Sequence, residues 1–362
     1  MTYLDANATE PVRPAALAAA LAALQAVGNP SSVHAAGRAA RRVLEDARER
    51  LAARFGAAPA DLVFTSGGTE ADAWAIAAFG RGRRLIVGAT EHDAVRAAAT
   101  GAAVLPVDGQ GIADLDALRR LLAEGAPALV CLMLANNETG TIQPVAQAAA
   151  LCRDAGALLH VDAVQAAGRI PLDPAALHAD SIALSSHKLG GPPGAGALLL
   201  GPRAAGIITP LIAGGGQERG RRGGTPPLPA IAGFAAAAIE ATGAAALSGL
   251  RDAIEQAAVA AGAVVIGAGA PRLPNTTCLA LPGVRAETQV IALDLEGVAV
   301  SAGAACSSGK VARSHVLDAM GLGALAGEAI RISLPWSATA ADVAAFARAY
   351  PRVAARLSRA GH

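Results

Sequence analysis

Residues 181–191 read Ser-Ile-Ala-Leu-Ser-Ser-His-Lys-Leu-Gly-Gly, a short apolar run that ends in hydroxyls, a histidine, a lysine and two glycines. The lysine is unusual for this chain, because only Lys188 and Lys310 are lysines among 30 Lys and Arg side chains. Arginine carries the same charge, so the primary amine is what distinguishes Lys188. An amine can form a Schiff base with an aldehyde and a guanidinium cannot. The alternative is an ordinary solvated loop lysine.

The segment 181–184 belongs to a series of short apolar runs that alternate with helical stretches. We predict strands over 61–64, 84–88, 128–134, 157–161, 181–184 and 196–200. We predict helices over 15–27, 34–55, 71–79 and 228–241. This alternation is typical of βα units, and it indicates an α/β fold with a mainly parallel sheet between helices.

The pattern changes after Gly249. Strands are predicted over 264–266, 277–281, 298–300 and 329–334, and a last helix runs from Thr339, with Asp342 as an acidic capping partner, to about Arg356. We therefore predict a large domain over 15–249 and a smaller α+β domain over 250–362. Residues 1–14 are expected to pack with the small domain.

Composition limits the classes of function. With 53% hydrophobic residues in 362, the chain can bury a sizeable core, and a net charge of +1 without a basic aromatic patch argues against nucleic-acid binding. No run of 18 apolar residues and no signal-peptide pattern occurs, so we expect no membrane association. The four cysteines, Cys131, Cys152, Cys278 and Cys306, contain no Cys-x-x-Cys pair. We expect no metal site and a cytoplasmic location.

Polar clusters follow the ends of the predicted strands, where open α/β sheets bind their ligands. The turn at 65–70 can bind an anion through backbone N–H groups, or it can simply cap a helix. Asp162, with Gln165 three residues on, needs a cation if it is buried, unless it too caps a helix. His92 can stack on a flat ring or transfer protons, or it can be merely exposed. Together with Lys188, this set meets the needs of pyridoxal phosphate.

Several motifs resemble those of a known family. Residues 185–198 are similar to the cofactor-lysine motif of the class V aminotransferases, and residues 3–9, 136–140 and 160–165 strengthen the likeness. Residues 301–309, Ser-Ala-Gly-Ala-Ala-Cys-Ser-Ser-Gly, resemble the active-cysteine loop of group I cysteine desulfurases of the NifS and IscS type. The resemblance covers nearly the whole chain. It implies the fold of type I pyridoxal-phosphate enzymes.

The resemblance also implies roles for individual residues. Lys188 would hold the cofactor covalently, Asp162 would pair with the ring nitrogen, and His92 would stack on the ring and move protons. The ring hydroxyl would face Asn137 and Gln165. The phosphate would be bound by four residues of one chain and one donated across a homodimer interface: Gly68, Thr69, Ser185 and His187, and Thr225. The substrate carboxylate would be held by Asn29 and Arg331, a side chain suited to bidentate binding.

The implied reaction is the removal of sulfur from L-cysteine. The thiolate of Cys306 would attack the substrate sulfur and leave a persulfide on Cys306 and alanine. The sulfur would then pass to an acceptor, such as an iron–sulfur scaffold or a tRNA-thiolation protein. Alternatives are a selenocysteine lyase, another class V enzyme, or a non-catalytic scaffold. One departure from the motif is Pro335-Trp336, where many relatives have Gly-Arg; another is Lys310, downstream of Cys306.

Overall fold

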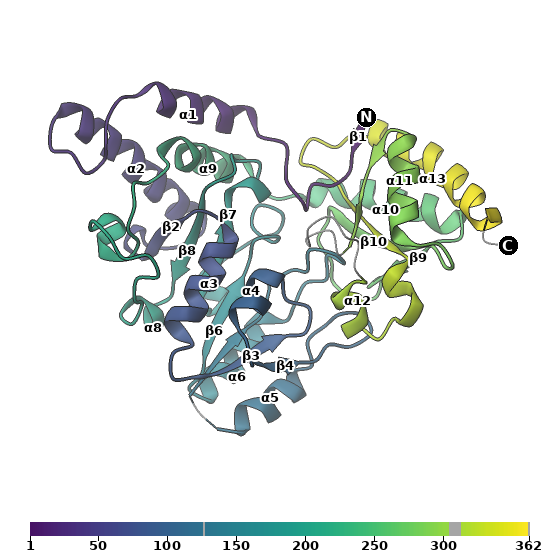
Figure 1. The fold of residues 1–362 in the computed structure, drawn as a ribbon, viewed down its shortest axis with the longest axis horizontal. Helices are drawn as coiled ribbons and strands as arrows, with labels where there is room; N and C mark the ends of the chain where they lie inside the picture. Colours follow the sequence, from purple (N-terminus) through teal and green to yellow (C-terminus); the bar gives the residue numbers. More distant parts are fainter. Residues whose placement is uncertain (126, 304–312, 361–362) are drawn as a thin grey trace.

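The computed structural model describes residues 1–125, 127–303 and 313–360. A seven-stranded sheet with its helices forms the larger part of the molecule, and a second sheet carries the C-terminal helices (Figure 1). The N-terminal segment runs between these two parts, and its strand pairs with a strand of the C-terminal part.

The large sheet has the strand order β2-β8-β7-β6-β5-β3-β4. Its strands are β2 (Leu62–Thr65), β3 (Arg84–Gly88), β4 (Ala103–Leu105), β5 (Ala128–Cys131), β6 (Leu158–Asp162), β7 (Ser181–Ser185) and β8 (Gly196–Leu200). The run from β7 to β4 is parallel, and only β8 pairs antiparallel with both of its neighbours. The prediction of a mainly parallel sheet is therefore confirmed.

Helices cover both faces of this sheet. Successive strand residues point to opposite faces: Val63 joins a core with α3 (Gly68–Phe79) and α4 (Asp93–Ala98), whereas Leu62 and Phe64 join the core on the other face. The second face is covered by α2 (Ala35–Arg54), α5 (Leu115–Ala123), α6 (Val145–Asp154) and α9 (Leu228–Glu240), with α1 (Pro14–Gln25) packed on α9. Shorter helices are α7 (Pro174–Leu177) and α8 (Pro202–Ala205).

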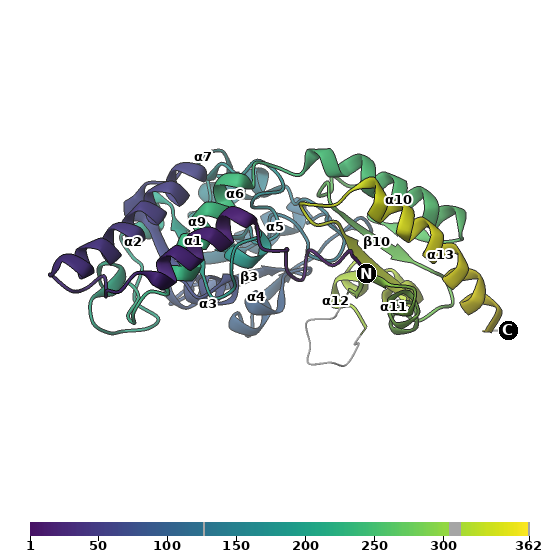
Figure 2. The ribbon, with the colours of Figure 1, turned by 90° about the horizontal axis from the view of Figure 1, so that it is seen from above.

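The second sheet is antiparallel, in the order β12-β13-β10-β9. Its strands are β9 (Val264–Ile266), β10 (Thr276–Ala280), β12 (Ser301–Ala302) and β13 (Ala329–Ser333). Helices α10 (Ser248–Ala260) and α13 (Ala340–Ala360) lie side by side on it (Figure 2), with α11 (Ala286–Leu295) and α12 (His315–Ala319) nearby. The first strand, β1 (Thr2–Tyr3), pairs with β11 (Val298–Ala299), and Leu4 lies in this core. The proposed domain boundaries stay predictions.

Element ends differ from the predicted ones by a few residues. Helix α3 begins at Gly68 rather than at 71, and α13 continues to Ala360 rather than ending near Arg356. Strand β4 was not predicted, because its three residues lie at the sheet edge and leave Val104 exposed. The predicted cap of α13 is confirmed: the backbone N–H and the hydroxyl of Thr339 both donate to Asp342.

One bent pair of helices has the length and composition of a membrane-spanning segment among the described residues. Among the described residues, no single helix is both long and apolar enough to cross a membrane. The segments Leu228–Glu240 and Ala245–Ala260 meet the length and composition criteria only when taken together, and they are bent by 68° relative to one another.

Candidate active site

A cavity of about 500 Å³ lies where the strands of the large sheet end, between that sheet, the N-terminal segment and the second sheet. Ten of the predicted site residues line it: Gly68, Thr69, His92, Asn137, Asp162, Gln165, Ser185, His187, Lys188 and Arg331. Strand ends supply most of these side chains, as expected for an open α/β sheet.

Lys188 ends the short 3-10 turn Ser186–Lys188 that follows β7. Its Nζ donates to the carbonyl oxygens of Asn7, at 2.5 Å, and Ala8, at 2.9 Å. The N-terminal segment therefore orients the amine within the cavity. This segment was quoted for its family likeness, but no role in the site was predicted for Asn7.

Asp162 is the last residue of β6 and lies on the cavity wall. Burial, and then the nearby Asp72, raise the pKa of its carboxyl to about 7, although the backbone N–H of Val164 donates to Oδ1 at 2.8 Å. A carboxylate in this position gains most from a cationic partner. Asp162 therefore fits the predicted contact with a protonated ring nitrogen.

His160 and Asp72 form a buried pair next to Asp162. The ring of His160 contacts Asp72 at 3.1 Å and the hydroxyl of Ser181 at 2.8 Å. Burial lowers the pKa of His160 to about 4 and raises that of Asp72 to about 7. The imidazole is therefore neutral near pH 7 and adds no full positive charge beside Asp162. Asp72 also lines the cavity and was not predicted.

The N-terminus of α3 carries Gly68 and Thr69, two of the residues predicted to bind the phosphate. The helix begins at Gly68, and a Cβ there would lie 2.6 Å from a methyl group of Val164. Only glycine lets the first turn, with Thr69, approach the cavity so closely. Ser185, at the end of β7, and His187 line the same cavity. Burial and the nearby Lys188 lower the pKa of His187 to about 4, so its ring is neutral at pH 7.

His92 caps α4. The backbone N–H of Ala94 donates to its Nδ1 at 3.1 Å, so the neutral ring carries its proton on Nε2. The side chain lines the cavity. In this tautomer His92 presents an N–H donor, and it can accept a proton only if the cap at Nδ1 breaks.

Arg331 lies on β13 and reaches the cavity from the second sheet. Its guanidinium donates to the backbone oxygen of Asn137 at 3.0 Å and pairs with Asp5 at 2.6 Å. These contacts hold the fork in place for a carboxylate. Asp5 also lines the cavity, and its role was missed because one carboxylate in an N-terminal loop gives no distinct pattern.

Two predicted residues do not line this cavity, and a third lies outside the part of the chain that the structure describes. Asn29 lies in the connection from α1 to α2, at the far end of the large sheet (Figure 1), and its side chain accepts from the backbone of Ser31. Asn29 therefore does not line this cavity in its own chain, and its contact with the substrate carboxylate stays a prediction. Thr225 is exposed and does not line the cavity either. Cys306 lies outside the described residues.

The residues present fit pyridoxal phosphate. The cavity combines an amine for the aldehyde, an acid for the ring nitrogen, a helix N-terminus for the phosphate and a histidine beside them. The close approach at Gly68 supports the fit, since a side chain there would push the first turn of α3 off the cavity. The described residues contain no group of three or more His, Cys, Asp or Glu able to hold a metal ion.

Comparison with known proteins identifies the family. Residues 2–346 match the model of the class V aminotransferases. The chain belongs to this family. A cysteine desulfurase from Cereibacter sphaeroides is 45% identical over 94% of this chain and 92% of its own. An IscS-like cysteine desulfurase from Mycobacterium tuberculosis is 39% identical over 99% of this chain and 98% of its own.

Solved structures agree with this assignment. A NifS-like protein from Rickettsia africae superposes with a TM-score of 0.89, at 34% identity, over 98% of this chain and 99% of that one. Within the class V family, the chain thus groups with the cysteine desulfurases, which use pyridoxal phosphate. The predicted family, fold, enzyme class and cofactor are confirmed.

Proposed function

We propose that the enzyme removes sulfur from L-cysteine, with L-alanine and a persulfide on Cys306 as the products. The observation that carries this proposal is the convergence of Lys188, Asp162 and Arg331 on one cavity from three separate parts of the chain. When bound, pyridoxal phosphate withdraws electrons from the substrate and weakens its C–S bond. Side chains of the protein bind the substrate, transfer protons and attack the substrate sulfur.

Arg331 is proposed to bind the substrate carboxylate. A guanidinium has five N–H donors, so Arg331 can keep its bond to Asn137 while it binds a carboxylate through the side that now faces Asp5. Asp5 keeps the buried cation compensated until the substrate arrives. This exchange of one carboxylate for another orients L-cysteine within the cavity.

Lys188 and His92 are proposed to handle protons. The Nζ of Lys188 leaves the carbonyl oxygens of Asn7 and Ala8 when it acts on the substrate Cα. His92 donates through Nε2, since its Nδ1 is held by the cap of α4. Asp162 stays ionised once it is paired with a cation, which reverses the rise in its pKa caused by burial.

Cys306 is proposed to be the nucleophile. Its thiolate forms an S–S bond to the substrate sulfur while the substrate C–S bond breaks. The electron pair of that bond stays with the carbon, which takes up a proton and leaves as L-alanine. Sulfur is thereby oxidised and carbon reduced, so no external oxidant is needed. The segment containing Cys306 follows β12, whose Ser301 lines the cavity.

The test is release of alanine and sulfide from L-cysteine with added dithiothreitol. We expect equal amounts of both from the wild type and a loss of at least about 100-fold in Cys306→Ala. Cys152→Ala is the matched control, because Cys152 is buried on α6 and burial raises its pKa to about 12. Full activity of Cys306→Ala on cysteine would contradict the proposal. Full activity on selenocysteine alone would favour a selenocysteine lyase.

We also propose a homodimer. The outer face of α1 and the loop after it expose aliphatic side chains, including Leu17 at 53%, Leu24 at 66% and Val27 at 87% of their surface. Such a face favours burial against another protein surface. A second copy would also explain why Asn29 and Thr225 lie outside the cavity of their own chain. Sedimentation showing a monomer with full cofactor occupancy would contradict this proposal.

The sulfur acceptor is proposed to be a protein of iron–sulfur assembly or tRNA thiolation, in the cytoplasm. The location is supported by the free thiols of Cys131, Cys152 and Cys278, which suit a reducing compartment. Transfer of ³⁵S from labelled cysteine to candidate acceptors tests the first point. Cell fractionation followed by immunoblotting tests the second.

A further inference from the structure

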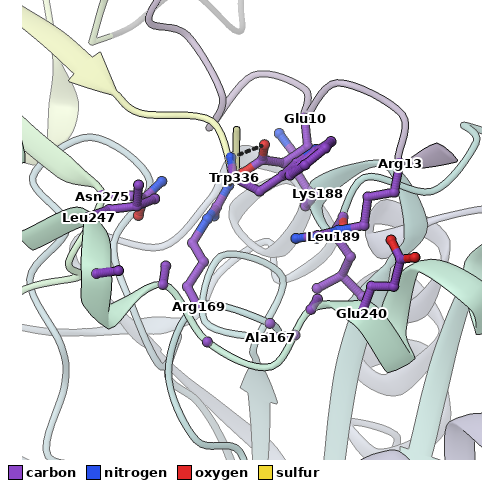
Figure 3. Close-up of a pocket in the computed structure, with 15 residues that line it drawn as sticks. Glu10, Arg13, Ala167, Arg169, Lys188, Leu189, Glu240, Leu247, Asn275 and Trp336 are labelled. Carbon is purple, nitrogen blue, oxygen red and sulfur yellow. Dashed lines mark hydrogen bonds and ion pairs between the residues drawn. The ribbon is translucent and has the colours of Figure 1, made fainter. Parts of the chain in front are cut away.

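Lys188 also lines a second cavity, of about 120 Å³, which Figure 3 shows. The same side chain lines the first cavity. The walls of the second cavity carry two acids and two arginines: Glu10, Glu240, Arg13 and Arg169. The ring of Trp336 closes one side, with Arg13 stacked 4.8 Å from the ring centroid. Glu10 and Arg169 form an ion pair in this cavity, and Arg169 also contacts Gln165, which lines the first cavity.

Arg169 follows Gln165 by four residues and is 4% exposed. It donates to the backbone oxygen of Gln165 at 2.9 Å and, in a second and shorter contact, to the side-chain oxygen of Gln165. It also donates to the backbone oxygen of Ala6 at 3.3 Å. Its guanidinium therefore ties Gln165 to the N-terminal segment.

These contacts fix which way the amide of Gln165 points. Arginine can only donate hydrogen bonds, so the amide oxygen must face Arg169. The amide nitrogen then faces the backbone oxygen of Asn7, which can only accept, at 3.0 Å. One of its two hydrogens makes this bond. The other is available to an acceptor in the first cavity, which Gln165 lines.

Glu10 holds the arginine in this position. Its Oε1 lies 3.4 Å from the guanidinium of Arg169, and its Oε2 accepts from the backbone N–H of Trp336 at 3.2 Å. Burial raises the pKa of the Glu10 carboxyl and lowers that of Arg169, and each charge offsets the other's effect. A neutral side chain at position 10 would leave Arg169 without its acidic partner.

We infer that Arg169 is a positioning residue, which holds Gln165 so that its amide N–H, rather than its carbonyl oxygen, faces the ring hydroxyl of the cofactor. The inference rests on the proposed place of the cofactor beside Gln165. Without Arg169, the amide could turn over and present its oxygen to the ring oxygen. When the ring oxygen is ionised, two acceptors would then face each other and the hydrogen bond would be lost.

The test is a pH titration of the visible absorbance of the bound cofactor in four holoenzymes: wild type, Arg169→Met, Gln165→Leu and the double variant. A donor to the ring oxygen lowers the pH midpoint, so each single change should raise it by about half to one pH unit. Removing the positive charge of Arg169 also raises the pH midpoint, through its electric field. The double variant separates this charge effect from the positioning effect, because positioning acts only through Gln165.

We expect Arg169→Met to shift the midpoint at least twice as far in the wild-type background as in the Gln165→Leu background. Equal shifts in both backgrounds, or none in either, would overturn the inference. Glu10→Gln combined with Arg169→Met gives the same readout without an unpaired buried acid, should the single variant fold poorly. Wild-type enzyme without a cofactor band would instead contradict the proposed function.

Discussion

The two cavities that meet at Lys188 both contain buried carboxyl groups, but they differ in whether those groups have a cationic partner. In the smaller one, Glu10 is matched by Arg169 and the N–H of Trp336, and Arg13 donates to Leu189 and stacks on Trp336. In the larger one, Asp162 and Asp72 share one buried region, and burial raises the pKa of each carboxyl to about 7.

The larger cavity contains buried carboxyls that a cationic ligand would stabilise, whereas the buried Glu10 of the smaller cavity is already paired with a cation of the chain. Uncompensated buried carboxylates destabilise the cofactor-free protein, and a cationic ligand relieves that cost. A buried pair with matched charges has no such need, and loss of either partner leaves an orphan. Substitutions in the two cavities should therefore change stability in opposite directions.

The largest effect is expected where the two cavities meet. Lys188→Ala should lower alanine production by at least about 10⁴-fold, because it removes the only amine that the described residues place in the larger cavity wall. The bonds that its Nζ makes to Asn7 and Ala8 go to backbone carbonyls, and we expect the fold to survive their loss. An alanine assay measures the loss of activity, and thermal unfolding measures whether the fold survives. Lys188→Arg, which keeps the charge, is the control; activity in that variant above one hundredth of wild type would contradict the role of the amine.

The next largest effect is expected from breaking the smaller cavity. Arg169→Met leaves the acid of Glu10 buried without its cation, and we expect a loss of about 3–5 kcal/mol in the free energy of unfolding. The double variant Glu10→Leu with Arg169→Met should recover at least half of this loss. Denaturant unfolding of cofactor-free protein measures both. A single variant as stable as wild type would show that the pair is solvated.

A gain in stability is expected from the larger cavity. Ionising a carboxyl whose pKa rises from 3.8 to about 7 costs about 4 kcal/mol. Part of the rise at Asp162 comes from the nearby Asp72, so we expect Asp162→Asn to gain about half of that free energy. Because the folded pKa is raised, wild-type stability falls as pH rises from about 4 to 7. The gain should be near zero at pH 4 and full above pH 7.

Thermal unfolding of cofactor-free protein across pH 4–8 measures this gain. Pyridoxal phosphate should then stabilise the wild type more than Asp162→Asn, which reverses the order of the two proteins. A variant less stable than wild type at pH 8 would mean that Asp162 is already compensated within the chain.

The sequence predicted the larger cavity well, because its residues follow strands with clear apolar patterns. Lys188, Asp162 and His92 each come directly after or near a strand end, and the topology of a parallel sheet brings such ends together. Asp5 and Asn7 were missed as site residues, since their place depends on pairing of the N-terminal segment with the second sheet.

The smaller cavity could not be predicted. Glu10, Arg169 and Trp336 are separated by more than 150 residues in sequence and come from three parts of the chain. None of them lies in a pattern with chemical meaning by itself. The departure at Pro335-Trp336 was visible, but its contact with Glu10 follows only from the fold.

The smallest effect is expected at Trp336, and it tests how far the smaller cavity depends on charge rather than packing. The indole Nε1 donates to the backbone oxygen of Pro11 at 2.8 Å, while the backbone N–H serves Glu10. Trp336→Phe removes only the first bond and keeps a ring beneath Arg13, so we expect a loss of about 1 kcal/mol in unfolding free energy and unchanged alanine production. Trp336→Ala also removes the cation–π contact and should cost at least twice as much. If both variants stayed folded at the assay temperature yet lost activity, the smaller cavity would take part in catalysis and would not merely support the site.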